Sequence, residues 1–302
     1  MNYVIGVDGG GTKTLALLAD AAGQVVASGV SGASNYNVVG FEKACAALED
    51  AINLARENHP GEISALCLGL AGAGRQADIE KFHTWAVAKF PGTAVKVVND
   101  AELLLAAGSP IGPVLALICG TGSIVYGRTA TGELIRAGGW GYLFGDEGSG
   151  YAIGVAALRA VMQEYDGRGP LTLLTELVLR RRGLSSPAEL VRNIYGAKSP
   201  RLEVASLSDL VELAASQMDR VALAILDEAA RELSRTVAVV YPQLGTATAP
   251  LVISGGTILH GTYLQTAFHH ACATLGLMFT MVRHVPQPAE GAVQLARTML
   301  PG

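Results

Sequence analysis

Residues 3–19 read YVIGVDGGGTKTLALLA, and this stretch decides the fold. An apolar run ends in the carboxylate of Asp8, three glycines follow at 9–11, and a second apolar run begins at Thr14. Two such runs around a glycine-rich turn predict a β-hairpin. Glycines lack a Cβ, so several backbone N–H groups can point into one space, and the turn is therefore suited to bind a phosphate.

Two familiar nucleotide-binding motifs do not fit this turn. A Walker A loop has glycine directly before Lys-Thr and is followed by a helix, whereas here Thr12 precedes Lys13 and a strand is expected next. The spacing and context of a dinucleotide fingerprint are also absent. A hairpin phosphate loop is favoured, in which Thr12 and Thr14 add hydroxyl donors and Asp8 holds the hydration shell of Mg²⁺. The alternative is an ordinary glycine-rich hairpin.

The same pattern returns later in the chain. An apolar run at 114–118 leads into Gly120-Thr121-Gly122-Ser123, a second run follows at 124–128, and a third run follows a turn, as in the first unit. Such a repeat predicts an internal duplication and two similar domains that face one another. Thr121 and Gly122 would then form a second phosphate loop.

The remaining pattern is typical of an α/β protein. Apolar periodicity predicts these further strands and helices: strands at 63–69, 94–98 and 250–253, and helices at about 41–58, 77–89, 208–241 and 288–300.

Composition excludes several classes of function. The chain has 302 residues, enough for two domains, with 50% hydrophobic residues and a formal net charge of −4. No basic surplus exists for nucleic acid, no apolar run is long enough for a membrane span, and the N-terminus lacks a signal-peptide pattern. A cytoplasmic location is expected. The four cysteines are scattered and form no metal or redox motif.

Three further segments are candidates for the site. Asp100 follows a predicted strand and suits a general base for a substrate hydroxyl or a helix N-cap, and both roles can hold together. Gly255 and Gly256 follow another strand, where they suit either nucleotide binding or a plain strand-to-helix turn. The glycine-rich segment 138–150 carries Trp140 and two carboxylates, a combination that suits a polyol ligand.

In this order, the segments resemble the actin-like ATPase and sugar kinase superfamily, whose members pair two ribonuclease-H-like domains around a central cleft. Within it the chain is similar to the N-acetylglucosamine kinase and glucosamine kinase group of the BadF/BadG-type ATPase family. The resemblance implies an α/β fold with a first domain at 1–108 plus 286–302 and a second at 109–285. It also implies a homodimer.

The resemblance further implies an ATP- and Mg²⁺-dependent kinase that phosphorylates the 6-hydroxyl of a small amino sugar. The implied roles are these: ATP at Gly10, Gly11, Thr12, Lys13, Thr14, Thr121, Gly122, Gly255 and Gly256, Mg²⁺ near Asp8, the base at Asp100, and sugar contacts at Asn35, Gly139, Trp140 and Asp146, besides Asp100 itself.

One residue departs from the group. Eukaryotic acetylglucosamine kinases carry a serine in the loop that reads Gly69-Leu70-Ala71-Gly72 here, where it lies near the acetamido group. Ala71 lacks that hydroxyl, so free glucosamine becomes an alternative substrate. Within the kinase interpretation, N-acetylmuramate or another amino sugar is a separate alternative.

Two rival functions use the same fold. An activator-type ATPase would share a [4Fe–4S] cluster between subunits and would need two cysteines near the second loop, where only Cys119 lies in the sequence. A non-catalytic sugar sensor would carry a DNA-binding segment or a zinc-binding cysteine cluster, and neither pattern is present.

Overall fold

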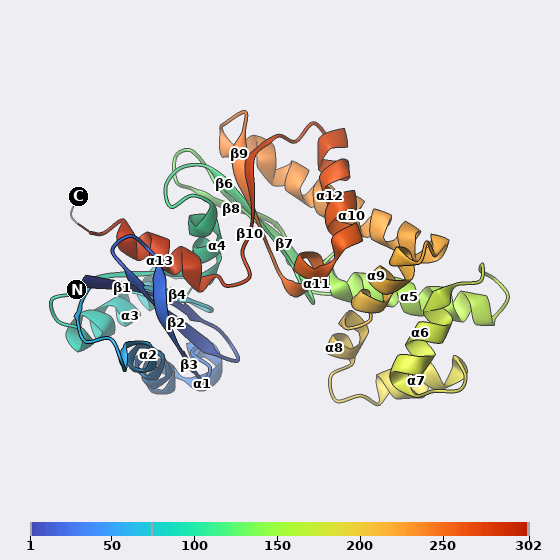
Figure 1. The fold of residues 1–302 in the computed structure, drawn as a ribbon, viewed down its shortest axis with the longest axis horizontal. Helices are drawn as coiled ribbons and strands as arrows, with labels where there is room; N and C mark the ends of the chain where they lie inside the picture. Colours follow the sequence, from blue (N-terminus) through green and yellow to red (C-terminus); the bar gives the residue numbers. More distant parts are fainter. Residues whose placement is uncertain (1, 74, 301–302) are drawn as a thin grey trace. The chain divides into compact units, whose positions relative to one another are not determined.

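The computed structural model describes residues 2–73 and 75–300 and divides the chain into two compact units (Figure 1). Unit 1 comprises residues 1–112 and 287–302, and unit 2 comprises residues 113–286. Each unit contains one five-stranded sheet with helices packed on it. Within the described residues, no helix combines the length and apolar character that crossing a membrane requires.

The sheet of unit 1 has the strand order β3-β2-β1-β4-β5. Its strands are β1 (Asn2–Gly9), β2 (Thr14–Asp20), β3 (Val25–Ser31), β4 (Glu62–Leu70) and β5 (Ala94–Asn99). The first three strands form an antiparallel meander, and β4 and β5 run parallel to β1. The carboxyl ends of β1, β4 and β5 therefore meet at one edge of the sheet, which is where open α/β sheets bind ligands.

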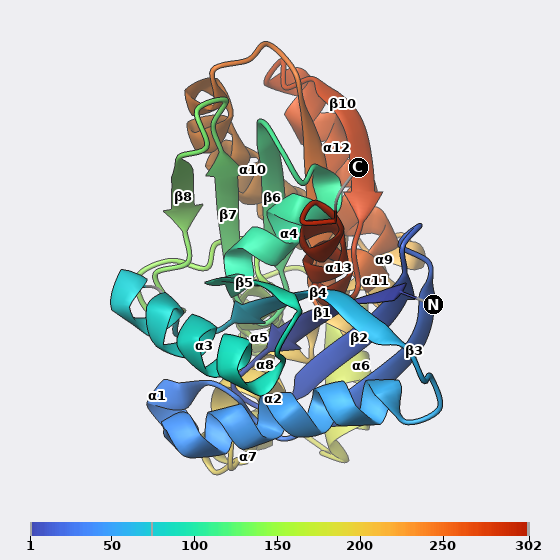
Figure 2. The same ribbon diagram turned by 90° about the vertical axis from the view of Figure 1, so that its left-hand side faces the viewer.

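Helices cover both faces of this sheet, as Figure 2 shows. Two lie on one face, α2 (Phe41–Arg56) and α3 (Gln76–Lys89), with the short α1 (Tyr36–Val39) before them, and two on the other, α4 (Asp100–Gly108) and α13 (Ala289–Arg297). Alternate strand residues such as Ile5 and Val4 enter separate hydrophobic clusters on the two faces, as the two-residue period of a strand requires. A Cβ at Gly6 would lie 2.3 Å from the backbone nitrogen of Val293, so glycine permits α13 to pack directly on β1.

The sheet of unit 2 repeats the order of the first, as β10-β9-β6-β7-β8. Its strands are β6 (Val114–Cys119), β7 (Ser123–Arg128), β8 (Leu134–Gly138), β9 (Ala249–Ser254) and β10 (Phe279–His284). Again three antiparallel strands are followed by two that run parallel to the first of them. The predicted duplication and the α/β fold with two ribonuclease-H-like sheets are confirmed.

The prediction of one long helix over 208–241 is wrong. The structure has α9 (Ser208–Ser216) and α10 (Arg220–Val240), separated by Met218, whose φ of 63° lies in the left-handed region. The side chain of Asp219 then accepts a hydrogen bond from the backbone N–H of Ala222 and caps α10. Periodicity did not reveal this break because no glycine or proline marks it.

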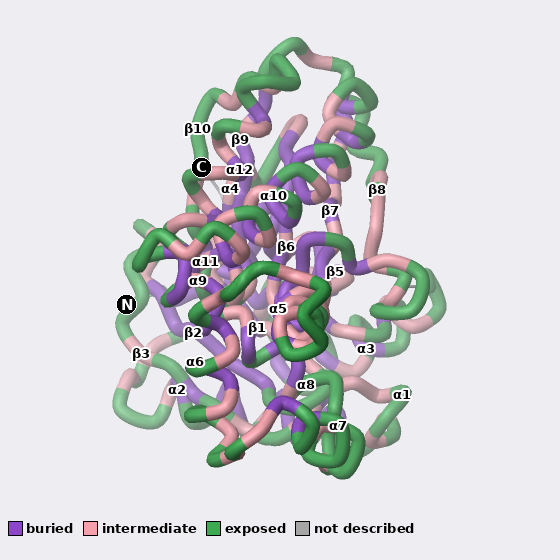
Figure 3. The backbone as a smooth tube through the Cα atoms, turned by 90° about the vertical axis from the view of Figure 1, so that its right-hand side faces the viewer, coloured by how far each residue is buried: buried purple, intermediate pink, exposed green. Residues whose placement is uncertain are grey.

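Several elements of unit 2 had no sequence prediction. Besides β10 they are α5 (Gly150–Tyr165), α6 (Leu173–Arg182), α7 (Ala188–Tyr195), α8 (Pro200–Ala205), η1 (Tyr241–Leu244), α11 (Gly256–His260) and α12 (Thr262–Thr274). Figure 3 shows that α7 is mostly exposed whereas the central strands are buried. The long helix α10 packs against α12, α9 and the sheet.

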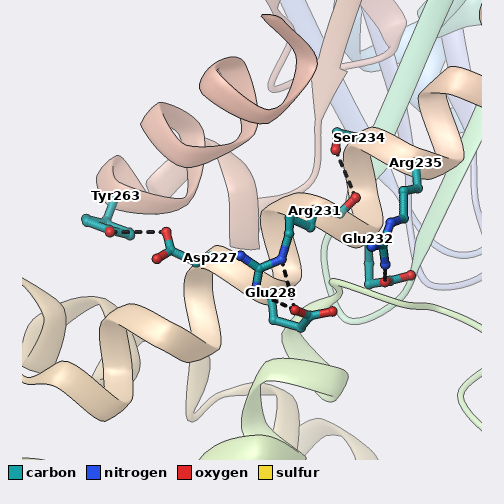
Figure 4. A network of polar contacts seen from close by, with 7 residues as sticks. All are labelled: Asp227, Glu228, Arg231, Glu232, Ser234, Arg235 and Tyr263. Atoms are coloured by element: carbon teal, nitrogen blue, oxygen red, sulfur yellow. Dashed lines mark hydrogen bonds and ion pairs between the residues drawn. The ribbon is translucent and has the colours of Figure 1, made fainter. Parts of the chain in front are cut away.

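Polar contacts along the outer face of α10 support its packing (Figure 4). Tyr263 at the start of α12 donates a hydrogen bond from its hydroxyl to the Asp227 carboxylate at 3.1 Å. Glu228 pairs with Arg231 three residues on, and the same spacing recurs one turn later. Such exposed pairs contribute little to stability because water and salt screen them, so the apolar core carries most of it.

Candidate functional site

The candidate residues of unit 1 gather at the carboxyl edge of its sheet. Asp8 of β1 lies opposite Gly69 of β4, and Leu70 lies opposite Asn99 of β5. The backbone N–H of Ala71 donates to the carbonyl of Gly9 at 2.8 Å. Residues far apart in the sequence are thereby brought to one strip of the sheet.

The first glycine loop is a tight hairpin turn. The N–H of Gly10 donates to the carbonyl of Lys13 at 3.0 Å, and a Cβ built on Gly11 would meet no atom within 4 Å. Gly11, Thr12 and Lys13 are exposed, so their polar groups are open to a ligand. Thr14 differs: its side chain is fully buried, and its hydroxyl bonds with the Gly32 carbonyl and another hydroxyl. Its side chain therefore shapes the loop.

Asn35 is tied to the same loop. Its backbone N–H and that of Ser34 both donate to the Gly10 carbonyl, at 3.1 and 3.0 Å. Its side-chain oxygen accepts from the N–H of Asn37 and caps α1 at 3.1 Å. A Cβ on Gly72 would lie 2.7 Å from that oxygen, so glycine at a φ of 89° lets the loop after β4 approach Asn35 closely. The amide nitrogen of Asn35 makes no hydrogen bond with the residues that the structure describes, so its two N–H groups can donate to a ligand.

Two carboxylates share this edge. Burial, together with the negative charge of Asp100, raises the pKa of Asp8 to about 6 against the opposing charge of Lys13. Burial likewise raises the pKa of Asp100, while hydrogen bonds from backbone N–H groups lower it. Unit 1 thus holds two partly desolvated carboxyl groups that favour a proton or a cation nearby.

The helix cap at α4 is provided by Asn99. Its side-chain oxygen accepts from the N–H of Ala101 at 3.1 Å. Asp100 occupies the first helical position, and its Oδ1 accepts from the same N–H at 3.0 Å. The N-cap interpretation of Asp100 is therefore wrong, because Asn99 occupies the cap position.

The second glycine loop is held by three neighbouring segments. The N–H of Gly120 donates to the Gly122 carbonyl at 2.9 Å and closes the turn. The carbonyl of Gly120 accepts from the N–H of Gly150, at the start of α5, and from the hydroxyl of Thr257. Gly255, at a φ of 99°, packs so closely that a Cβ there would lie 2.4 Å from the carbonyl of Cys119.

A cavity of about 500 Å³ opens beside this loop within unit 2. It is lined by backbone and small polar groups of the second and third loops, among them Thr121, Gly256 and Thr257, and by residues of α8 and α9 such as Leu202 and Glu212. Its volume is within the usual range for a nucleoside-sized ligand. Since β9 ends at Ser254 and α11 begins at Gly256, the strand-to-helix turn is also real.

Gly139 and Trp140 lie just beyond β8. Gly138 of β8 lies opposite Ile124 of β7, so β8 ends at the same edge of the sheet as the second loop. A Cβ on Gly139 would clash with the Ile124 side chain at 2.3 Å, and its φ is 68°. Trp140 is 64% exposed, and the guanidinium of Arg136 lies 4.4 Å from the centroid of its ring. An exposed, held indole provides the apolar platform that sugar rings use.

Asp146 is buried, and its carboxylate binds an arginine that no sequence motif identified as a site residue. Only 4% of the residue is exposed, its φ is 60°, and its Oδ2 accepts from Nη2 of Arg201 at 3.1 Å. A non-glycine residue in the left-handed region indicates a conformation imposed by its surroundings. No motif surrounds Arg201 in α8, so sequence patterns gave no signal for it.

Both sheets present glycine loops at the carboxyl ends of their strands, the arrangement of an ATPase of the ribonuclease-H-like, actin-like class. The model of the BadF/BadG/BcrA/BcrD ATPase family matches residues 5–296. The chain therefore belongs to this family.

Similar proteins have related descriptions. The chain is 36% identical over 306 residues to the N-acetylmuramic acid/N-acetylglucosamine kinase of Clostridium acetobutylicum, with 99% of each chain covered. It is 35% identical to the N-acetyl-D-glucosamine kinase of Dictyostelium discoideum, over 84% of this chain and 85% of the other. A solved structure from Chromobacterium violaceum, described as a candidate N-acetylglucosamine kinase, superimposes with a TM-score of 0.70 at 28% identity and covers 97% of this chain and 98% of its own.

Proposed function

We propose that the protein is an ATP-dependent amino-sugar kinase that phosphorylates the 6-hydroxyl of N-acetylglucosamine or a close relative. The observation that carries the proposal is the half-buried Asp100, which lies at the same sheet edge as the first glycine loop and whose pKa is raised by burial. A general base works best when its pKa lies near the working pH, and burial moves Asp100 in that direction. The full-length similarity to amino-sugar kinases supports the choice of acceptor.

The chemistry is an in-line displacement. The oxygen of the sugar 6-hydroxyl forms a bond to the γ-phosphorus of ATP, the bond to the β,γ-bridging oxygen breaks, and ADP leaves. Asp100 takes the proton of the attacking hydroxyl. Because such transition states need little covalent help, positioning and charge neutralisation provide most of the rate enhancement.

Nucleotide contacts are assigned to both glycine loops. In unit 1 the phosphate oxygens are bound by N–H groups and a cation of Gly10 and the exposed Gly11, Thr12 and Lys13. Thr14 supports the loop through the bond of its hydroxyl to the Gly32 carbonyl. In unit 2 the nucleoside enters the cavity of about 500 Å³. The nucleotide contacts of this unit are assigned to Thr121, Gly122, Gly255 and Gly256.

The residues of unit 1 fit a magnesium ion. Mg²⁺ is commonly bound through one or two carboxylates together with substrate phosphates and water. The half-buried Asp8, with a pKa raised to about 6, is destabilised by the charge of Asp100, and a nearby cation removes that penalty. Asp8 would hold the hydrated ion, which neutralises charge on the phosphates when bound.

Sugar contacts are assigned to Asn35 and Asp100 in unit 1 and to Gly139, Trp140 and Asp146 in unit 2. The Asn35 amide can donate to sugar hydroxyls, and the exposed Trp140 ring can stack on the apolar face of the pyranose. Ala71 lies beside Gly9 and adjoins Gly72, which contacts Asn35. Its methyl group offers no hydrogen bond to an acetamide, so free glucosamine is also a candidate acceptor. N-acetylmuramate is a further candidate because a relative that is 36% identical is described as an N-acetylmuramic acid/N-acetylglucosamine kinase.

The activator-type alternative is not favoured. A cluster needs thiolate ligands that a partner subunit can reach, whereas Cys119 is fully buried and donates a hydrogen bond from Sγ to the Gly148 carbonyl at 3.4 Å. Burial raises the pKa of Cys119 to about 12, and it does the same for Cys272. Neither thiol is poised to bind iron.

The experiment is a coupled ADP-release assay with Mg-ATP and each of four acceptors: N-acetylglucosamine, glucosamine, N-acetylmuramate and glucose. We expect turnover with at least one amino sugar and little with glucose. The absence of turnover with all four, while ATP still binds, would refute the kinase proposal and favour a sensor. A homodimer, which the resemblance implies, and a cytoplasmic location, which the sequence pattern predicts, are parts of the proposal that light scattering and cell fractionation test.

A further inference from the structure

Arg201 on α8 lies against the second glycine loop. A Cβ on Gly122 would come within 3.1 Å of its Nη2 and within 2.7 Å of Oδ2 of Asp146. Glycine at position 122 therefore leaves room for the ion pair to pack against the loop backbone. The loop itself, residues 119–123, has no charged side chain, so Arg201 provides a positive charge that the loop lacks.

The guanidinium is held in place on two sides. Nη2 donates to the buried carboxylate of Asp146 at 3.1 Å, and the guanidinium carbon lies 5.3 Å from the ring centroid of Tyr142. The Tyr142 ring in turn packs on Tyr151, with 5.0 Å between the centroids. A planar guanidinium fixed by one carboxylate and one ring presents its other donors in a constant direction.

The other donors of Arg201 are available to a ligand. A guanidinium has five N–H groups, and among the described residues only the bond to Asp146 engages one of them. The side chain is 43% exposed, whereas that of its partner is 6% exposed. Arg201 also lines a cavity of about 730 Å³ in unit 2, and the next residue, Leu202, lines the smaller cavity beside Thr121.

We propose that Arg201 is an oxyanion-binding residue of the second glycine loop, oriented by Asp146. The oxyanion has two possible sources under the proposed kinase function, on which this inference rests. One is a phosphate oxygen of the nucleotide, and the other is the carboxylate of an amino sugar with a 3-O-lactyl group. Planar guanidinium donors bind both groups in the same way.

The test compares the wild type with Arg201→Gln, using N-acetylglucosamine and N-acetylmuramate as acceptors and varying Mg-ATP. We expect kcat/KM to fall about tenfold or more, as is usual when a donor to a reacting or bound anion is removed. An equal fall with both acceptors identifies the phosphate, and a fall confined to N-acetylmuramate identifies the carboxylate. Values within twofold of the wild type for both acceptors would overturn the proposal.

Two further measurements separate binding from a structural effect. Arg168→Ala is the matched control, because Arg168 lines the same cavity and, among the described residues, forms its ion pair with the nearby Asp166. The kinetics of this variant should not change. Guanidinium ions added at millimolar concentration should partly restore Arg201→Ala, which loss of packing would not allow. If the wild type phosphorylates neither these two acceptors nor glucosamine or glucose, the kinase proposal fails. Calorimetry with tripolyphosphate then tests Arg201 directly, and equal affinity in wild type and Arg201→Gln contradicts its role.

Discussion

Replacing Asp8 by asparagine should stabilise the ligand-free protein while abolishing its activity. Burial and the nearby Asp100 raise the pKa of Asp8 from 3.8 to about 6. That rise corresponds to about 3 kcal/mol by which the folded protein disfavours the ionised carboxyl. Asparagine is a neutral isostere that avoids this penalty, but it lacks the negative charge that we propose binds Mg²⁺.

The sign of the pH dependence follows from the raised pKa. Because the folded state holds its proton up to a higher pH than the unfolded chain, the contribution of Asp8 to stability falls as pH rises from about 4 to about 6. The advantage of Asp8→Asn should therefore approach about 3 kcal/mol at pH 8 and be roughly half that near pH 5.

Urea unfolding of both proteins across pH 5–8.5 measures this difference. Asp50→Asn, an exposed substitution on α2, is the matched control and should show no comparable gain. A difference between wild type and Asp8→Asn that stays flat with pH, or a destabilised variant at pH 8, would refute the electrostatic account of this residue. Addition of Mg-ATP should stabilise the wild type more than the variant.

Three further predictions concern Gly255, Met218 and the buried cysteines. Gly255→Ala forces a Cβ to within 2.4 Å of the Cys119 carbonyl at a φ of 99°, so we expect a loss of about 2 kcal/mol or more in urea unfolding and much weaker ATP binding. Met218→Gly relieves a φ of 63° at an exposed position and should raise stability by about 1 kcal/mol, whereas an unchanged midpoint would contradict that strain. Burial raises the pKa of Cys67, Cys119 and Cys272 to about 12, so these thiols should resist a disulfide reagent at pH 8 until urea unfolds the chain.

The sheets were predictable because their strands are short apolar runs bounded by glycine turns. The repeat of run, turn and run at Asp8 and again at Gly120 indicated two similar sheets, and the strand orders confirm it. Parallel strands place their carboxyl ends together, so Asp8 and Asp100 could be expected at one edge from sequence order alone.

Other features depend on tertiary contacts that no local pattern contains. The break before α10 arises at Met218, which takes a conformation that its side chain does not favour, and Asp219 then caps the next helix. Arg201 acquires its place only because α8 packs on α5 beside the loop that carries Asp146. The buried hydroxyl of Thr14 likewise became clear only from its bonds to Gly32 and Ser34.

The most direct test of the kinase proposal is the identity of the product and its dependence on Asp100. Phosphorus–proton NMR of the reaction with N-acetylglucosamine should show a phosphate coupled to the C6 protons, together with one ADP for each phosphorylated sugar. Asp100→Asn, which keeps the shape of the side chain but cannot accept the proton, should bind ATP normally and form product at least about a hundredfold more slowly. Phosphate on another oxygen, or near-normal turnover by Asp100→Asn, would contradict the account.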